Sequence, residues 1–230
     1  MYDLALGHTS EKVTVREYNK RVNTEQGYLL IVEDDFDVLK LLETTLNFSG
    51  YRVVTARNGN EGLEAIRKER PAIVIADIMM PTLDGFGFVH RLRLNSETRS
   101  IPVIFITATY VSREDREFAL DIGVTRFIQK PIALEEFLTT IKELFVQGES
   151  NSLEPLNELK FYEGYRERLE AKLNQKNKQI ELDERLLGTK SDEDDYFLQE
   201  SLHQSIGERE ELIYLLDQVH ERLEKLIKPD

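Results

Sequence analysis

The chain contains no cysteine among its 230 residues, and this absence excludes disulfide bonds and thiolate metal sites. It also lacks a long hydrophobic run, because its longest apolar stretch, at 101–111, is too short to span a bilayer and is interrupted by threonines. The N-terminus has no apolar core of signal-peptide length. These absences, together with 40% apolar and 32% charged residues, predict a folded, cytoplasmic protein.

Positive charge is scarce toward the C-terminus. Residues 149–230 contain 21 Asp and Glu against 12 Lys and Arg. The phosphate backbone of a nucleic acid would repel so acidic a segment. We therefore expect no DNA- or RNA-binding module there and no nucleic-acid partner.

Short apolar runs rich in β-branched residues recur from residue 28 onward. They lie at 28–33, 51–56, 72–77, 102–107 and 126–129. The segments between them have apolar residues three and four apart, as at Leu39, Leu42 and Leu46, which is typical of helices. Alternating strands and helices predict an α/β fold with a five-stranded, doubly wound parallel sheet. The most apolar runs are expected to be the central strands, and they are 28–32, 72–76 and 102–106.

The β-type runs stop at about residue 148, and long helical patterns replace them. The composition predicts an N-terminal arm at 1–26, an α/β domain at 27–147, a linker at 148–155 and a helical hairpin at 156–230. The two helices of the hairpin are expected at about 156–187 and 195–228.

Both predicted hairpin helices carry an apolar seam with a four-three repeat, which is typical of a coiled coil. In the second helix the seam positions are Leu198, Leu202, Ser205, Arg209, Leu212, Leu216, Val219, Leu223 and Leu226. In the first they are Leu159, Tyr162, Arg166, Leu169, Leu173, Lys176, Ile180, Asp183 and Leu187. Because further apolar residues lie off the seam, such as Ile213 and Ile227, we expect a homodimer in which two hairpins form a four-helix bundle.

Polar side chains follow the predicted strands at the points where the strands end. The first strand ends in Glu33 and Asp34, the third in Asp77, the fourth in Thr107 and the fifth in Lys130. These ends converge on one crevice in a doubly wound sheet. Three carboxylates, a hydroxyl and an ammonium in one place suit a hard divalent cation and a phosphoryl group attached to the central aspartate.

Residues 28–146 resemble the receiver domain of two-component response regulators, whose fold is flavodoxin-like. The family pattern has an acidic pair after strand one, and a phosphoacceptor Asp followed by Met-Pro and Asp-Gly after strand three. Thr-Ala then follows strand four and Lys-Pro follows strand five. The chain has all of these in order, with "ADIMMPTLDG" at 76–85 as the longest piece.

The resemblance implies a role for each matching residue. Asp77 is the phosphoacceptor, Thr107 the switch hydroxyl, Lys130 the phosphate-binding ammonium and Phe127 the switch aromatic. Mg²⁺ is implied as the cofactor, with Glu33, Asp34, Asp77 and the backbone carbonyl of Met79 as its ligands. The resemblance also implies that Met79 and Thr109 control the approach of water to the phosphoryl group.

Some of these polar and sulfur-containing residues have a structural interpretation instead. Asp35 and Asp84 each precede a predicted helix, so we interpret both as helix N-caps. Met80 is interpreted as a packing residue. A phosphatase of the haloacid dehalogenase type is excluded, because it needs a second acid where this chain has Met79.

The resemblance implies a response regulator without a separate enzymatic activity, whose partner is a histidine kinase or a phosphotransfer protein. Its output is expected to be the helical module, through dimerisation or protein binding. An alternative stays open, in which the chain is a phosphorelay intermediate and His203 or His220 of the second hairpin helix accepts the phosphoryl group.

Overall fold

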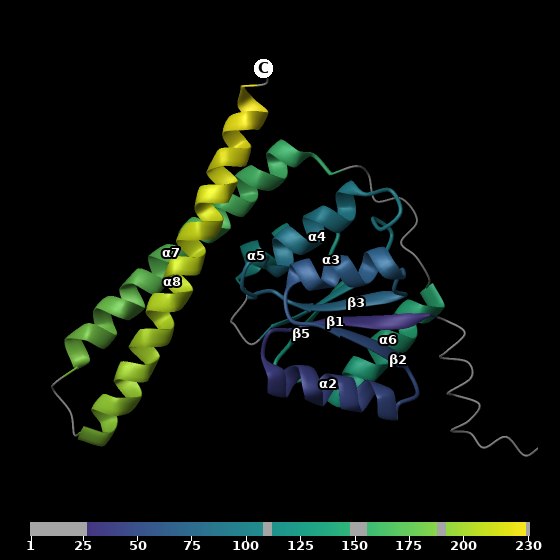
Figure 1. The fold of residues 1–230 in the computed structure, drawn as a ribbon, viewed down its shortest axis with the longest axis horizontal. Helices are drawn as coiled ribbons and strands as arrows, with labels where there is room; N and C mark the ends of the chain where they lie inside the picture. The colour runs from purple at the N-terminus through teal and green to yellow at the C-terminus, as the bar shows by residue number, and fades with distance from the viewer. Residues whose placement is uncertain (1–26, 108–111, 148–155, 188–191, 229–230) are drawn as a thin grey trace, which may run out of the picture.

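The computed structural model describes residues 27–107, 112–147, 156–187 and 192–228 (Figure 1). The predicted N-terminal arm, the predicted linker and Thr109 lie outside the described residues. No helix within the described part of the chain combines the length and the apolar composition needed to cross a membrane.

A five-stranded parallel sheet forms the centre of the first domain. Its strands are β1 (Tyr28–Val32), β2 (Arg52–Ala56), β3 (Ile73–Asp77), β4 (Val103–Thr107) and β5 (Arg126–Gln129), in the order β2-β1-β3-β4-β5. Every residue of β1, β3 and β4 is buried. The prediction that the three most apolar runs are the central strands is therefore confirmed.

Helices cover both faces of the sheet, as Figure 1 shows. They are α2 (Phe36–Phe48), α3 (Gly59–Lys68), α4 (Gly85–Leu94), α5 (Arg113–Asp121) and α6 (Leu134–Gln147). Alternate residues of β1 point to opposite faces. Leu29 and Ile31 join a cluster with α2 and α6, whereas Leu30 and Val32 join a cluster with α3, α4 and α5. The doubly wound α/β fold is thus confirmed.

Two long helices, α7 (Glu158–Leu186) and α8 (Asp192–Ile227), form the predicted hairpin. They run antiparallel and pack along their length (Figure 1), with ion pairs from Arg222 to Glu158 at 2.8 Å and from Lys176 to Glu208 at 2.5 Å. All nine seam positions predicted in α8 are buried or half-buried. In α7 the prediction fails at Leu159, which is 38% exposed.

The apolar face of α7 is wider than predicted, and its second stripe packs against the α/β domain. Phe161, Tyr165 and Leu169 are buried in the same cluster as Phe86 of α4 and Phe118 of α5. The rings of Phe118 and Phe161 stack with their centroids 5.7 Å apart. The backbone approaches closely here, since a Cβ at Gly164 would lie 2.8 Å from the Phe118 ring.

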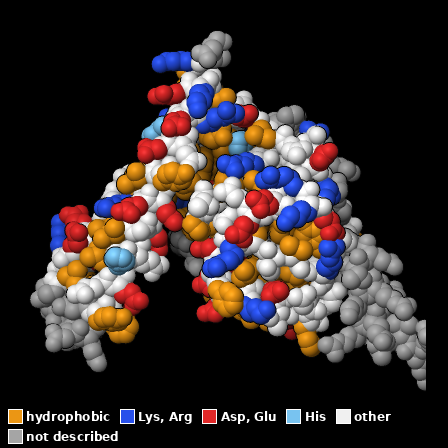
Figure 2. Space-filling model, viewed as in Figure 1, with side chains coloured by type: hydrophobic (Ala, Val, Ile, Leu, Met, Phe, Trp, Pro, Cys, Tyr) orange, Lys and Arg blue, Asp and Glu red, His pale blue; other side chains and the backbone are white. Residues whose placement is uncertain are grey.

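This packing leaves the apolar residues that predicted a dimer exposed. The sequence suggested that a second hairpin covers the apolar residues that one helix leaves exposed. In the structure, the chain's own α/β domain covers a second apolar stripe on α7, because α4 and α5 present aromatic side chains to it, whereas Ile213 and Ile227 of α8 stay exposed. Apolar side chains are exposed on the described part of the hairpin, among them Leu182, Tyr196, Phe197, Ile213, Tyr214 and Ile227. Figure 2 shows such exposed hydrophobic side chains along the hairpin.

Candidate functional site

Three carboxylates meet at the C-terminal edge of the sheet. Glu33 and Asp34 follow β1, and Asp77 is the last residue of the adjacent strand β3. One oxygen from each lies within 4.8 Å of the others. Parallel pairing of β1 and β3 brings these acids together, as the pattern of strand ends predicted.

Asp77 lies at the centre of this cluster and is only 9% exposed. Its Oδ1 atom is buried and has no hydrogen-bond partner among the described residues. Burial is the main cause that raises the pKa of Asp77 to about 7, and the charge of Glu33 adds to it, whereas the charge of Lys130 opposes it. A buried carboxylate of this kind needs a positive charge to stay ionised.

Lys130 supplies one positive charge. Its Nζ lies 2.8 Å from Oε2 of the buried Glu33 and 3.9 Å from Oδ1 of Asp77. Burial raises the pKa of Glu33, and the hydrogen bond from Lys130 opposes this shift. The backbone N–H of Lys130 donates to the carbonyl of Thr107 at 2.8 Å, and the Lys130–Pro131 peptide bond is cis. Lys130 is therefore held between two of the three acids.

The cluster fits a hard divalent cation. Among the described residues, three carboxylates lie near one ammonium, and Oδ1 of Asp77, which has no hydrogen-bond partner there, offers a ligand atom at the centre. Carboxylate oxygens with some retained water are the ligands that Mg²⁺ prefers. Glu33, Asp34 and Asp77 are thus the side chains that would hold the ion.

The switch candidates lie beside this site. Thr107 is buried at the end of β4, next to Asp77 on β3. Phe127 on β5 is half-buried, and its ring meets the Phe105 ring edge-on with centroids 5.6 Å apart. The guanidinium of Arg116 lies 5.3 Å from the centroid of the Phe127 ring. The Phe127 ring thus contacts both Phe105 of the sheet and the exposed Arg116 of α5.

The structural interpretations of the neighbouring residues are confirmed. Asp35 accepts hydrogen bonds from the backbone N–H groups of Asp37 and Val38, and it is the N-cap of α2. Asp84 accepts from Gly87 at 2.8 Å and is the N-cap of α4. Met80 is buried in the core. His203 and His220 are both exposed on α8.

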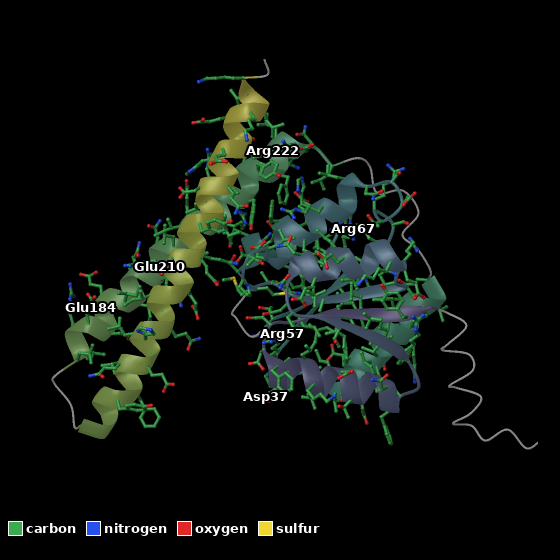
Figure 3. All side chains as sticks on the ribbon, in the orientation of Figure 1. Asp37, Arg57, Arg67, Glu184, Glu210 and Arg222 are labelled. Carbon is green, nitrogen blue, oxygen red and sulfur yellow. The ribbon has the colours of Figure 1, made fainter. Side chains whose placement is uncertain are left out.

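Sequence reasoning missed that the hairpin reaches this edge of the sheet. Nζ of Lys172 on α7 lies 3.3 Å from Sδ of Met79, two residues after Asp77. On α8, burial and the nearby charge of Asp34 raise the pKa of Glu211. In Figure 3 the middle of the hairpin, near Glu210, lies beside the edge of the domain that carries Arg57 and Asp37. A contact between residues 93 positions apart leaves no periodic signal in the sequence.

Comparison with known proteins agrees with this geometry. The family model for the response regulator receiver domain matches residues 29–142. Residues 29–142 therefore belong to the response regulator receiver family. A relative described as a probable transcriptional regulator ycf27 from Pyropia yezoensis is 39% identical over 123 residues, which is 54% of this chain and 49% of that protein.

Two further matches are a curated protein and a solved structure. An uncharacterized transcriptional regulatory protein, YkoG from Bacillus subtilis, is 38% identical over 125 residues, which is 54% of this chain and 53% of YkoG. The solved structure of chemotaxis protein CheY4 from Vibrio cholerae is 30% identical, with a TM-score of 0.49, and the match covers 51% of this chain and 98% of that chain. The chain spans about half the length of the curated relatives it matches.

Proposed function

We propose that this chain is a response regulator that accepts a phosphoryl group on Asp77 in the presence of Mg²⁺. One observation carries the proposal: the buried Asp77 lies within a cluster of three carboxylates and 3.9 Å from the ammonium of Lys130, and its Oδ1 has no hydrogen-bond partner in the described part of the chain. The proposed ligands of the ion are Glu33, Asp34, Asp77 and the backbone carbonyl of Met79.

Each residue of the site then has its own role in the phosphoryl transfer. An Asp77 oxygen attacks the donor's phosphorus, a new P–O bond forms, and the bond to the leaving group breaks with its electron pair going to the donor. Lys130 turns from Glu33 to the phosphoryl oxygens, and the Thr107 hydroxyl donates to one of them. Mg²⁺, when bound, supplies positive charge that favours the ionised carboxylate and neutralises the phosphoryl oxygens.

The same step provides a switch. Movement of Thr107 toward the phosphoryl group changes the packing beside Phe105, against which Phe127 lies edge-on. A different orientation of Phe127 would then alter its contact with Arg116 on α5. Because α5 also packs against α7 through Phe118 and Phe161, the change has a route to the hairpin.

We propose that the output is a protein interaction of the hairpin rather than DNA binding. Two matched relatives carry the description transcriptional regulator, but they match over about half of their length. In this chain, residues 149–230 have nine more acidic than basic residues, 21 against 12, which opposes contact with phosphate backbones. The proposed partners are a histidine kinase or phosphotransfer protein, which supplies the phosphoryl group in the cytoplasm, and a second copy of the chain.

Acetyl phosphate with Mg²⁺ tests the phosphoacceptor in the full chain. Intact-mass measurement is expected to show one added phosphoryl group in the wild type and none in Asp77→Asn. Asp35→Asn is the matched control, since it removes a neighbouring charge, retains an N-cap residue and should still be labelled. Labelling of Asp77→Asn would contradict the proposal, and label on His203 or His220 would favour a phosphorelay intermediate.

A further inference from the structure

The loop that follows Asp77 folds tightly against the end of β3. The N–H of Gly85 donates to the carbonyl of Ile78 at 2.8 Å, and a Cβ at Gly85 would lie 2.5 Å from the carbonyl oxygen of Asp77. Residues 78–84 therefore form a compact lobe beside the site, with Met79 half-buried in it. A contact made to this lobe is a contact made close to Asp77.

Helix α7 touches this lobe and the start of α4, which follows it. In the lobe, Nζ of Lys172 lies 3.3 Å from Sδ of Met79. On α4, the same Nζ lies 5.3 Å from the centroid of the Phe86 ring, and the Tyr165 ring lies 6.2 Å from that of Phe86. The hairpin is thus fixed to the segment that carries the candidate phosphoacceptor.

Lys172 restricts the side chain of Met79. An unbranched thioether has three rotatable bonds and adopts many orientations unless its neighbours hold it. The lysine ammonium contacts the sulfur, and its attraction to the Phe86 ring fixes the position of the ammonium. Met79 is already partly buried against the core, so this contact leaves one orientation favoured.

The orientation of Met79 matters for the fate of a phosphoryl group on Asp77. Hydrolysis requires the oxygen of a water to attack phosphorus in line with the Asp77 oxygen. The P–O bond to Asp77 then breaks, its electron pair returns to the carboxylate, and the water's protons pass to the released phosphate and solvent. An apolar side chain fixed two residues after Asp77 would obstruct this water and offer it no strong hydrogen-bond partner.

We propose that Lys172 is a positioning residue that holds Met79 over the phosphorylated Asp77 and slows hydrolysis. The docked hairpin thereby sets the lifetime of the signal. This inference rests on the proposed phosphorylation of Asp77. It assigns to α7 a role in the receiver's own chemistry, in addition to any role in output.

The test is the decay of label on the full-length protein. The chain is labelled with acetyl phosphate and Mg²⁺, the donor is removed, and the acid-labile phosphate that remains is measured over time. Lys172→Ala is expected to lose label faster by on the order of three- to tenfold. Lys172→Arg should decay like the wild type, and so should Lys178→Ala, which alters an exposed lysine of the same helix.

A double variant shows whether Lys172 acts through Met79. If it does, the label on the double variant Met79→Ala with Lys172→Ala decays at the same rate as on Met79→Ala alone. Without the Met79 side chain, loss of the Lys172 ammonium has no side chain to free. Multiplied effects in the double variant would overturn the proposal, and so would an unchanged rate in Lys172→Ala. Lys172→Met, which removes the charge and retains an apolar side chain, makes the same test if the alanine variant fails to fold. Failure of the wild type to take label would instead refute the phosphorylation of Asp77.

Discussion

The ring of His90 on α4 stacks on the ring of Phe161 on α7, with centroids 3.8 Å apart and planes 4° apart. His90 is 2% exposed, and its Nε2 has no hydrogen-bond partner among the described residues. A histidine in this position belongs to the packed interface between the receiver and the hairpin. It is stable there only as the neutral imidazole.

Acidification is therefore expected to weaken the protein through His90. Burial is the main cause that lowers its pKa from 6.5 to about 4, with Glu158 opposing and Arg91 and Arg222 assisting the shift. Between these values the unfolded chain binds a proton that the folded chain does not, so stability is complete above 6.5 and falls as the pH falls toward 4. A shift of this size corresponds to roughly 3 kcal/mol.

Urea unfolding at pH 7 and pH 5 measures this loss. His90→Phe keeps a stacked ring without a titratable group, and its stability should fall less than that of the wild type between the two pH values. His220→Phe changes an exposed histidine and should follow the wild type. Equal pH dependence in all three proteins would show that His90 is not the responsible group.

Phe161 is expected to contribute most of the docking energy of α7. It is 2% exposed, and its ring meets those of His90, Phe118 and Tyr165. Phe161→Ala leaves a cavity in this cluster and should lower the free energy of unfolding by about 3–5 kcal/mol. Leu159→Ala, on the exposed side of the same helix, should cost less than about 1 kcal/mol. Similar costs in denaturant titrations would contradict the packing described for α7.

Mg²⁺ should stabilise the wild type at neutral pH. The proposed ion site exists only in the folded chain, and an ion bound there would relieve the repulsion among Glu33, Asp34 and Asp77. Addition of Mg²⁺ is therefore expected to raise Tm in thermal unfolding, with no rise in Asp34→Asn. Asp37→Asn removes an exposed acid in the first turn of α2 and should retain the response. An equal rise in all three would indicate a general ionic effect.

The fold could be predicted from the sequence because the patterns that indicate strands and helices lie within short segments of the chain. Buried strands appear in the sequence as apolar runs. Asp35 and Asp84 lie where helices begin, and their side chains accept hydrogen bonds from the first backbone N–H groups of those helices. The second stripe of α7 could not be predicted in this way. Phe161 and Tyr165 lie beside the seam, and which stripe faces α8 depends on a partner surface that the helix sequence does not contain.

In the candidate site, too, some residues could be placed from the sequence and others could not. Residues within one motif, such as Asp77 with Met79, could be placed from spacing alone, and so could the strand-end residues Glu33 and Lys130. The contact of Lys172 with Met79 could not, because it depends on how the hairpin docks. The error at Leu159 has this cause too, since α7 turns Phe161 to the receiver and leaves Leu159 in solvent.

Leu216 and Ile213 separate the hairpin's own packing from its proposed dimerisation. Leu216 is 6% exposed and lies in the seam with α7, whereas Ile213 is 43% exposed on the same helix. Leu216→Asp buries a charge within one chain, so it should lower the helical signal in circular dichroism regardless of oligomeric state. Ile213→Asp places its charge in solvent in a single chain and should leave that signal unchanged.

Light scattering of the intact protein at micromolar concentration tests whether the chain forms a homodimer. If the exposed apolar residues of two hairpins meet, the wild type has about twice the mass of one chain, and Ile213→Asp has the mass of one chain with full helical content. Glu224→Gln changes an exposed position of α8 without adding a charge and should keep the wild-type mass. A monomeric wild type would refute the homodimer. In a monomer the receiver still covers the apolar surface that Phe161 and Tyr165 provide. The exposed residues Ile213 and Tyr214 would then be assigned to a different protein partner.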